Sequence, residues 1–315
     1  MRAGLLLPGQ GAQKVGMGAD FAAVSPAAKA LFERADSLLG LELSRVCFEG
    51  PAEELTRTDM AQPAIFTCSL AALAALEEGL GPLSPAGAAG LSLGEYTALS
   101  ACGALSFEDG LRLVRLRGRE MQAASEALAS GMTSVLGLEP GPVRELCTRA
   151  ARETGGICQV ANLNSPGQVV ASGEIPALER LEVLAREAGA RRALRLQVAG
   201  AFHSEVMRPA ARKLEQALGE VEIRPPRCPV WQNATACPET DPGRIRENLT
   251  RQLTAPVLWE ASFRRMAESL GEVPFLEPAP GRVLAGLARK IVPAVRVLSL
   301  ADEPSRQALL AEAPA

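Results

Sequence analysis

The order of the elements expected between residues 126 and 197 constrains the fold more than any other feature of this sequence. There the pattern predicts a strand, a helix, two strands, a helix and a strand, at 132–138, 142–153, 157–163, 168–172, 176–188 and 193–198. The order β-α-β-β-α-β is that of a ferredoxin-like unit. On both sides of this segment, short apolar strands (4–7, 274–276 and 295–300) alternate with amphipathic helices, as in a mainly parallel α/β sheet.

We therefore expect an α/β protein with two subdomains. Residues 1–125 and 198–315 form the large one, and residues 126–197 form a ferredoxin-like small subdomain inserted into it. A cleft is expected where the two bodies meet, and clefts between bodies are preferred sites for ligands.

Composition excludes several classes of function. The net charge of −3 provides no field for nucleic acid or an anionic membrane surface. One histidine and seven scattered cysteines without a C-x-x-C pair predict no metal site. The first apolar stretch is interrupted at Pro8, too early for a secretory signal, and we expect no later run of membrane-spanning length. A cytoplasmic protein is the expectation.

The segment Gly90-Leu91-Ser92-Leu93-Gly94 fits the pattern G-x-S-x-G. In a nucleophile elbow, the glycines allow a strand to turn sharply into a helix and expose the serine hydroxyl. Residues 86–89 are a weak strand candidate and 95–101 a plausible helix, whose N-terminus would stabilise negative charge beside Ser92. A glycine-flanked serine in a plain turn fits these five residues equally well.

A serine nucleophile needs a base, and His203 is the single histidine of the chain. It follows the last strand of the insertion and precedes a helix expected at 205–218, which places it near the cleft. A lone histidine is more often a surface or core residue, so the elbow is what favours a catalytic role. The sequence offers no obvious aspartate to orient it.

Arg117 lies in the apolar stripe of a helix that opens with the capping box Ser106-x-x-Asp109 and runs to about residue 128. An unpaired buried guanidinium is costly, so Arg117 either pairs with a carboxylate of the protein or awaits the anion of a ligand. A planar guanidinium can donate two parallel hydrogen bonds to a carboxylate, so an acyl chain that carries a carboxylate is a suitable ligand.

Taken together, these features and several further motifs resemble the malonyl-CoA:acyl-carrier-protein transacylase family, which includes the discrete acyltransferases of polyketide synthases. The resemblance spans nearly the whole chain. The further motifs are Pro8-Gly9-Gln10-Gly11-Ala12-Gln13, Gln62-Pro63-Ala64, Asn164-Ser165-Pro166-Gly167-Gln168-Val169-Val170, Gln252-Leu253, Pro256-Val257, Glu277-Pro278 and Pro280-Gly281.

The resemblance implies an α/β-hydrolase-like large subdomain with the ferredoxin-like small subdomain inserted. It also implies that malonyl-CoA is the substrate, that no cofactor is bound, and that a phosphopantetheinylated acyl carrier protein is the partner of a monomeric enzyme. The implied roles are Ser92 as nucleophile, His203 as base, Arg117 as carboxylate clamp, Gln10 and the Leu93 N–H as oxyanion hole, the Gln252 carbonyl as orienter of the histidine, and Phe202 as a limit on branched acyl groups. Leu91 departs from the family, which usually has histidine there, and Ala279 replaces a commoner glycine.

Two basic pairs, Arg191-Arg192 and Arg289-Lys290, match positions that such proteins place near the cleft mouth, where an acidic carrier could dock. A solvated surface explains each pair taken alone. Two other functions remain open at this stage: a thioesterase or lipase-like hydrolase using the same elbow, and a catalytically silent scaffold. The sequence does not decide between fatty-acid and polyketide synthesis.

Overall fold

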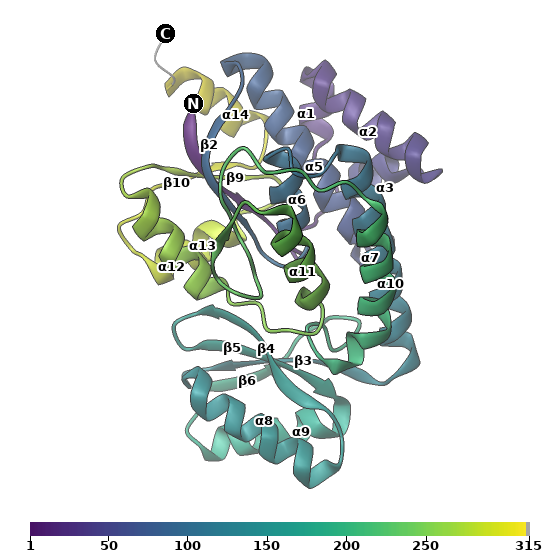
Figure 1. Cartoon of the computed structure of the whole chain (residues 1–315), viewed down its shortest axis with the longest axis vertical. Helices are drawn as coiled ribbons and strands as arrows, with labels where there is room; N and C mark the ends of the chain where they lie inside the picture. The colour runs from purple at the N-terminus through teal and green to yellow at the C-terminus, as the bar shows by residue number, and fades with distance from the viewer. Residues whose placement is uncertain (313–315) are drawn as a thin grey trace.

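The structure, a computed structural model, describes residues 1–312 and contains two β-sheets in two bodies that lie one above the other (Figure 1). The strands are β1 (Arg2–Leu7), β2 (Ser84–Gly90), β3 (Ser130–Leu136), β4 (Cys158–Ser165), β5 (Gln168–Glu174), β6 (Arg192–Arg195), β7 (Val230–Trp231), β8 (Pro238–Glu239), β9 (Phe275–Pro278) and β10 (Val297–Leu300). The helices are α1 (Ala19–Val24), α2 (Pro26–Leu39), α3 (Leu43–Glu49), α4 (Ala52–Thr56), α5 (Thr58–Leu80), α6 (Gly94–Ala101), α7 (Phe107–Ala127), α8 (Pro140–Thr154), α9 (Ile175–Glu187), a 3₁₀ turn (Glu205–Met207), α10 (Arg208–Glu220), α11 (Pro242–Gln252), α12 (Trp259–Leu270), α13 (Val283–Ile291) and α14 (Glu303–Glu312).

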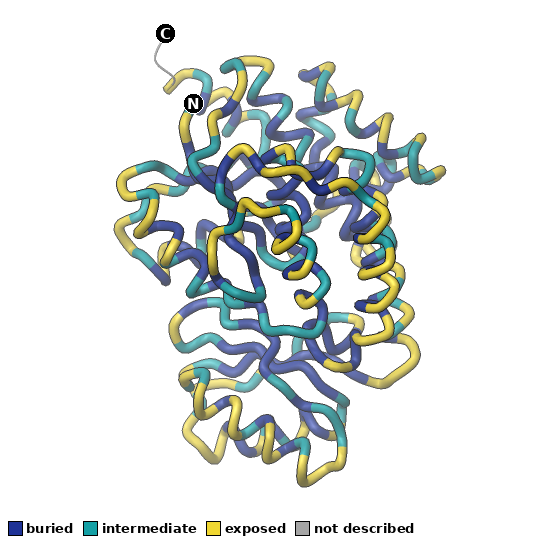
Figure 2. The backbone as a smooth tube through the Cα atoms, viewed as in Figure 1, coloured by how far each residue is buried: buried dark blue, intermediate teal, exposed yellow. Residues whose placement is uncertain are grey.

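The larger sheet has six strands in the order β10-β9-β1-β2-β7-β8, all parallel except β8. Side chains alternate between the faces of a strand, and both faces of β1 are buried. Leu5 and Leu7 join the core cluster that contains the apolar side chains of α5, α6 and α7, whereas Leu6 joins Trp259 and Phe263 of α12. Helices therefore cover both faces of this sheet, and its central strands β1 and β9 are buried (Figure 2).

The register of β1 and β2 positions the site. Leu7 pairs with Gly90, so the two parallel strands end side by side at the same edge of the sheet. In open α/β sheets, ligands bind beyond the carboxyl ends of the strands. The loops that carry Gln10 and Ser92 begin at this edge.

The smaller sheet has four strands in the antiparallel order β4-β5-β3-β6, with α8 and α9 packed together on it (Figure 1). The six elements predicted for this segment are present in the predicted order. The bounds differ by at most two residues, except at the last strand. That strand, expected at 193–198, ends at Arg195, and residues 196–199 leave the sheet to line a cleft.

The two bodies share backbone hydrogen bonds. Asn162 of β4 forms a parallel bridge with Val257, whose N–H donates to Ala161 O at 2.8 Å and whose carbonyl accepts from Leu163 N at 2.9 Å. The chain that enters α12 thus continues the edge of the smaller sheet, which fixes the position of one body on the other.

Helix α5 corrects one expectation from the sequence. It is long and apolar enough, with a mean hydropathy of 1.3, to pass as a candidate membrane span, although no segment of that length was expected. Within the protein, 83% of the apolar window is buried. It packs against α2 and α7, so its apolar surface is that of a core helix.

Candidate active site

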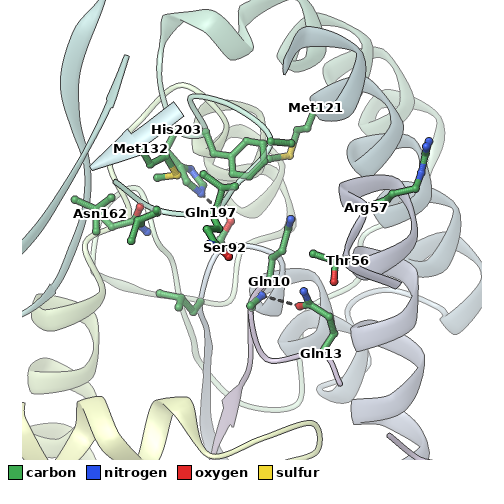
Figure 3. A pocket seen from close by; sticks show the side chains of 18 of the residues that line it. Gln10, Gln13, Thr56, Arg57, Ser92, Met121, Met132, Asn162, Gln197 and His203 are labelled. Carbon is green, nitrogen blue, oxygen red and sulfur yellow. Dashed lines mark hydrogen bonds between the residues drawn. The ribbon is translucent and has the colours of Figure 1, made fainter. Parts of the chain in front are cut away.

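A cleft of about 650 Å³ opens between the two bodies (Figure 3). One wall comes from the large body, through the loop after β1, α4, the elbow after β2, and α7. The opposite wall comes from β3, β4, β5 and residues 196–199 of the small body. Ser92, Arg117 and His203, which are distant in sequence, all line this cleft.

Ser92 lies in a tight turn between β2 and α6, with a left-handed backbone at φ 54°. A Cβ at Gly90 would lie 1.9 Å from the backbone of Gly94, and one at Gly94 would lie 2.1 Å from Leu7 O. Both glycines are therefore required sterically. A non-glycine residue at positive φ is strained, and such strain is common at functional sites. This is the geometry of a nucleophile elbow.

His203 is the partner of Ser92. Its Nε2 lies 2.7 Å from Ser92 Oγ, and its Nδ1 lies 2.8 Å from the carbonyl oxygen of Gln252. Because a carbonyl only accepts, Nδ1 carries the proton and Nε2 is the acceptor that faces the serine hydroxyl. Burial, and then the charge of Arg117, lower the pKa of His203 to about 4. At neutral pH the imidazole is uncharged and can take a proton from Ser92.

Arg117 is fully buried beside this pair. Its Nη1 donates to Gln62 Oε1 at 2.7 Å, and its Nη2 donates to Ser92 Oγ at 2.9 Å and to Gln252 Oε1 at 3.0 Å. Within residues 1–312, no carboxylate oxygen lies within 4.0 Å of it. The alternative that a protein carboxylate pairs directly with Arg117 is therefore wrong. Burial lowers the pKa of Arg117, but a guanidinium keeps its charge.

Two further N–H donors belong to the loops that follow β1 and β2. Leu93 is the N-cap residue of α6, and its N–H has no acceptor in the part of the chain that the structure describes. Gln10 lines the cleft, and its Nε2 makes a long hydrogen bond of 3.3 Å to Thr58 Oγ1. Among the described residues, each of these groups has an N–H hydrogen available to a ligand.

Comparison with known proteins identifies the family. Residues 5–290 match the model of the acyl transferase domain family. The chain is 42% identical over 297 residues to the malonyl CoA-acyl carrier protein transacylase of Bacillus subtilis (strain 168), an alignment that covers 94% of this chain and 92% of the relative. The chain belongs to the malonyl-CoA:acyl carrier protein transacylase family.

Solved structures of this family have the same fold. An acyl carrier protein S-malonyltransferase from Vibrio cholerae superposes with a TM-score of 0.92 at 40% identity, covering 97% of this chain and 99% of that chain. A malonyl-transacylase in complex with a type II polyketide synthase acyl-carrier protein superposes with a TM-score of 0.94 at 37% identity, covering 99% of this chain and 100% of that one.

Apolar side chains narrow the cleft around the family's reactive centre. Leu91, Phe202, Met121 and Met132 all line it. Met132 lies next to His203 in Figure 3, and Met121 lies further from it. Leu91 thus places an apolar side chain at the cleft directly before the nucleophile candidate Ser92.

The two basic pairs lie outside this lining. Arg191, Arg192, Arg289 and Lys290 are exposed, and none of them contacts the cleft directly.

Sequence reasoning assigned no role to Asn233. Its Oδ1 accepts from Ser92 N at 2.6 Å and its Nδ2 donates to Gly90 O at 2.7 Å, so its side chain clamps the elbow from the end of β7. The strand before it has only two residues, too short to produce a recognisable pattern. Gln62, matched only as a motif, proves to be a partner of Arg117.

Proposed function

We propose that this protein transfers a malonyl group from malonyl-CoA, through an ester on Ser92, to the phosphopantetheine thiol of an acyl carrier protein, for fatty-acid or polyketide synthesis. One observation carries the proposal. A serine and a neutral histidine in hydrogen-bond contact lie in a cleft beside a buried arginine that has no carboxylate partner within 4.0 Å among residues 1–312. The relatives are named for this reaction.

In the first half-reaction, His203 Nε2 takes the proton of Ser92 as Oγ attacks the thioester carbon. The Leu93 N–H and the Gln10 side chain stabilise the oxyanion, and each such donor is typically worth about 2.7 to 4 kcal/mol in the transition state. The tetrahedral intermediate collapses, the proton returns from His203 to the leaving sulfur, and coenzyme A departs.

In the second half-reaction, the carrier thiol gives its proton to His203 and attacks the malonyl ester, and Ser92 recovers its proton as it leaves. The kinetics are therefore ping-pong. Arg117 holds the malonyl carboxylate in both halves, in place of its present bond to Ser92 Oγ. Malonyl-CoA is a substrate, and these steps use no bound cofactor.

The orientation of His203 favours transfer over simple hydrolysis. Its Nδ1 donates to the peptide carbonyl of Gln252, whereas lipase-like hydrolases usually orient the histidine with a carboxylate. A cationic clamp is also of no use to an enzyme for neutral esters.

The remaining features fit this function. We assign residues 126–197 as a ferredoxin-like subdomain inserted into an α/β-hydrolase-like one (1–125 and 198–312), supported by the antiparallel order β4-β5-β3-β6. The last three residues of the expected range 198–315 lie outside the described residues. The exposed pairs Arg191-Arg192 and Arg289-Lys290 would attract an acidic carrier. A solved relative is in complex with a type II polyketide synthase acyl-carrier protein. We expect a cytoplasmic monomer.

Intact-protein mass spectrometry tests the proposal. Mixing the protein with malonyl-CoA should add one malonyl mass, and Ser92→Ala should remain unmodified. Holo carrier protein added afterwards should remove the label and acquire it. Equal labelling of Ser92→Ala, or rapid release of free malonate without any carrier, would contradict the scheme.

A further inference from the structure

Glu95 is a fully buried carboxylate three residues after the nucleophile, in the first turn of α6. Its Oε2 accepts from the backbone N–H of Asn233 and from Gln252 Nε2, both at 2.9 Å. Its Oε1 is buried and has no partner in the described part of the chain. The mechanism above does not use this group, and a buried carboxylate needs a reason to be there.

The amide of Gln252 connects Glu95 to Arg117. Its Nε2 donates to Glu95, and its Oε1 accepts from Arg117 Nη2 at 3.0 Å. An amide has donors at one end and acceptors at the other, so its orientation is set by the carboxylate on one side and the guanidinium on the other. Glu95 is thus the counter-charge of Arg117, and the Gln252 amide lies between them. The two charged groups do not form a direct ion pair.

Other charged groups are sparse around Glu95. Helix α6 packs against β1, β2, β7, α5 and α7. Arg117 of α7 is the charge that acts on Glu95, and Tyr96 is the next residue along α6. His203 contacts the backbone carbonyl of Gln252, the residue whose side chain donates to Glu95. The charged residues of α5, Asp59, Glu77 and Glu78, lie at the ends of that helix, and β2 and β7 contain none. Arg2 is exposed at the start of β1, and the charged residues of α7 other than Arg117 are exposed or half-buried.

The arrival of substrate changes the balance of charge. Before loading, one guanidinium faces one carboxylate through Gln252. Once a malonyl carboxylate binds Arg117, two carboxylates share a single buried cation, and like charges in one site favour protonation of one of them. Glu95 is the one that is fully buried and has an unpartnered oxygen among the described residues.

We infer that Glu95 is a positioning residue for malonyl selection: it balances Arg117 in the empty enzyme and takes up one proton when the malonyl carboxylate binds. This inference rests on the proposed function. The pKa of Glu95 supports it, because burial raises that pKa to about 7, against the lowering effect of the hydrogen bonds from Gln252 and Asn233 and of the charge of Arg117. Malonyl loading should therefore be favoured below pH 7, where Glu95 already holds a proton.

Calorimetry measures the proton directly. Malonyl-CoA is titrated into Ser92→Ala at pH 7.5 in two buffers of different ionisation enthalpy, and acetyl-CoA serves as the matched ligand without the carboxylate. With a coupling of one pKa unit, we expect malonyl-CoA to draw in about half a proton more than acetyl-CoA does at this pH. Adding Glu95→Gln to Ser92→Ala should abolish the difference, because the oxygen of the substituted amide can still accept both hydrogen bonds but the amide cannot titrate. Equal proton uptake for the two ligands would overturn the inference.

A pH profile gives the functional consequence. In the enzyme with Ser92 intact, the ratio of malonyl to acetyl loading should fall roughly tenfold between pH 6 and 8.5, since one pKa unit of coupling is a factor of ten. Glu95→Gln should flatten this profile, which a merely structural role would not do. If no ester forms from malonyl-CoA at any pH, the proposed function fails. If the ester forms with a ratio that does not change with pH, only the role of Glu95 fails.

Discussion

Ser92 and His203, 111 residues apart in the chain, meet with Oγ and Nε2 at 2.7 Å, and both have left-handed backbones, at φ 54° and 56°. Each is held from outside its own turn: Asn233 clamps the backbone at Ser92, and the Gln252 carbonyl fixes the imidazole of His203. The pair is therefore preorganised before any substrate arrives, which is how an active site avoids reorganisation during reaction.

The elbow glycines give a sharp steric test. Gly94→Ala places a methyl group 2.1 Å from Leu7 O, so the end of β1 or the start of α6 must move. We expect loss of malonyl labelling and a melting temperature lower by several degrees. Gly219→Ala on α10 is the matched control, because a Cβ added there would have no neighbouring atom within 4 Å. A fully active Gly94→Ala protein would contradict the geometry of the turn.

Arg117→Gln should change which acyl group is accepted. Hydrogen bonds to charged groups are worth about 1.5 to 3 kcal/mol, so kcat/KM for malonyl-CoA should fall at least tenfold. Loading of acetyl-CoA should be retained or improve. Arg119→Gln, exposed on the same helix, is the control and should behave as wild type. The measurement is competition between the two thioesters, read by intact mass, and unchanged malonyl selectivity would remove Arg117 from the clamp.

The side chain of Phe202 should exclude branched acyl groups. It is 6% exposed and lines the cleft next to His203. A methyl-sized group in such a pocket is worth about 1 to 3 kcal/mol, so Phe202→Ala should raise methylmalonyl loading relative to malonyl about 10- to 200-fold. Phe107→Leu, at the far end of α7 and outside the cleft, should leave the ratio unchanged. An unaltered ratio in Phe202→Ala would place the selectivity elsewhere.

Charge reversal separates docking from chemistry. Arg289→Glu with Lys290→Glu, or Arg191→Glu with Arg192→Glu, should raise the KM for the carrier and weaken its dependence on salt. Labelling by malonyl-CoA alone should not change, since neither pair lines the cleft. Arg144→Glu with Arg152→Glu, exposed on α8, is the control. Carrier transfer that survives reversal of both pairs at low salt would assign docking to another surface.

The sequence could predict those features that depend on local pattern. The order of the inserted elements, the burial of Arg117 within an apolar helical stripe and the cap of α7 by Ser106 all follow from periodicity or from short spacings. The contacts of Asn233, Gln62 and Glu95 could not be predicted this way. They are polar side chains of unremarkable local context, and only the tertiary packing of β7, α5 and α6 brings them to the elbow and the guanidinium.

The pKa of His203 can be measured directly, because it is the only histidine and its ring signals in an NMR titration are unambiguous. Burial, and secondarily Arg117, lower this pKa to about 4, against an ordinary value of about 6.5. The base therefore stays neutral as pH falls through 6, and the acid limb of acetyl-CoA loading should lie near pH 4. Between those two pKa values the unfolded chain binds the proton more readily, so this group's contribution to stability is present above pH 6.5 and is lost towards pH 4. Arg117→Gln should move the pKa upward but not fully to 6.5, because burial remains. A histidine that titrates near 6.5 in the wild-type protein would show that the imidazole is solvated and that the pair described here does not persist in solution.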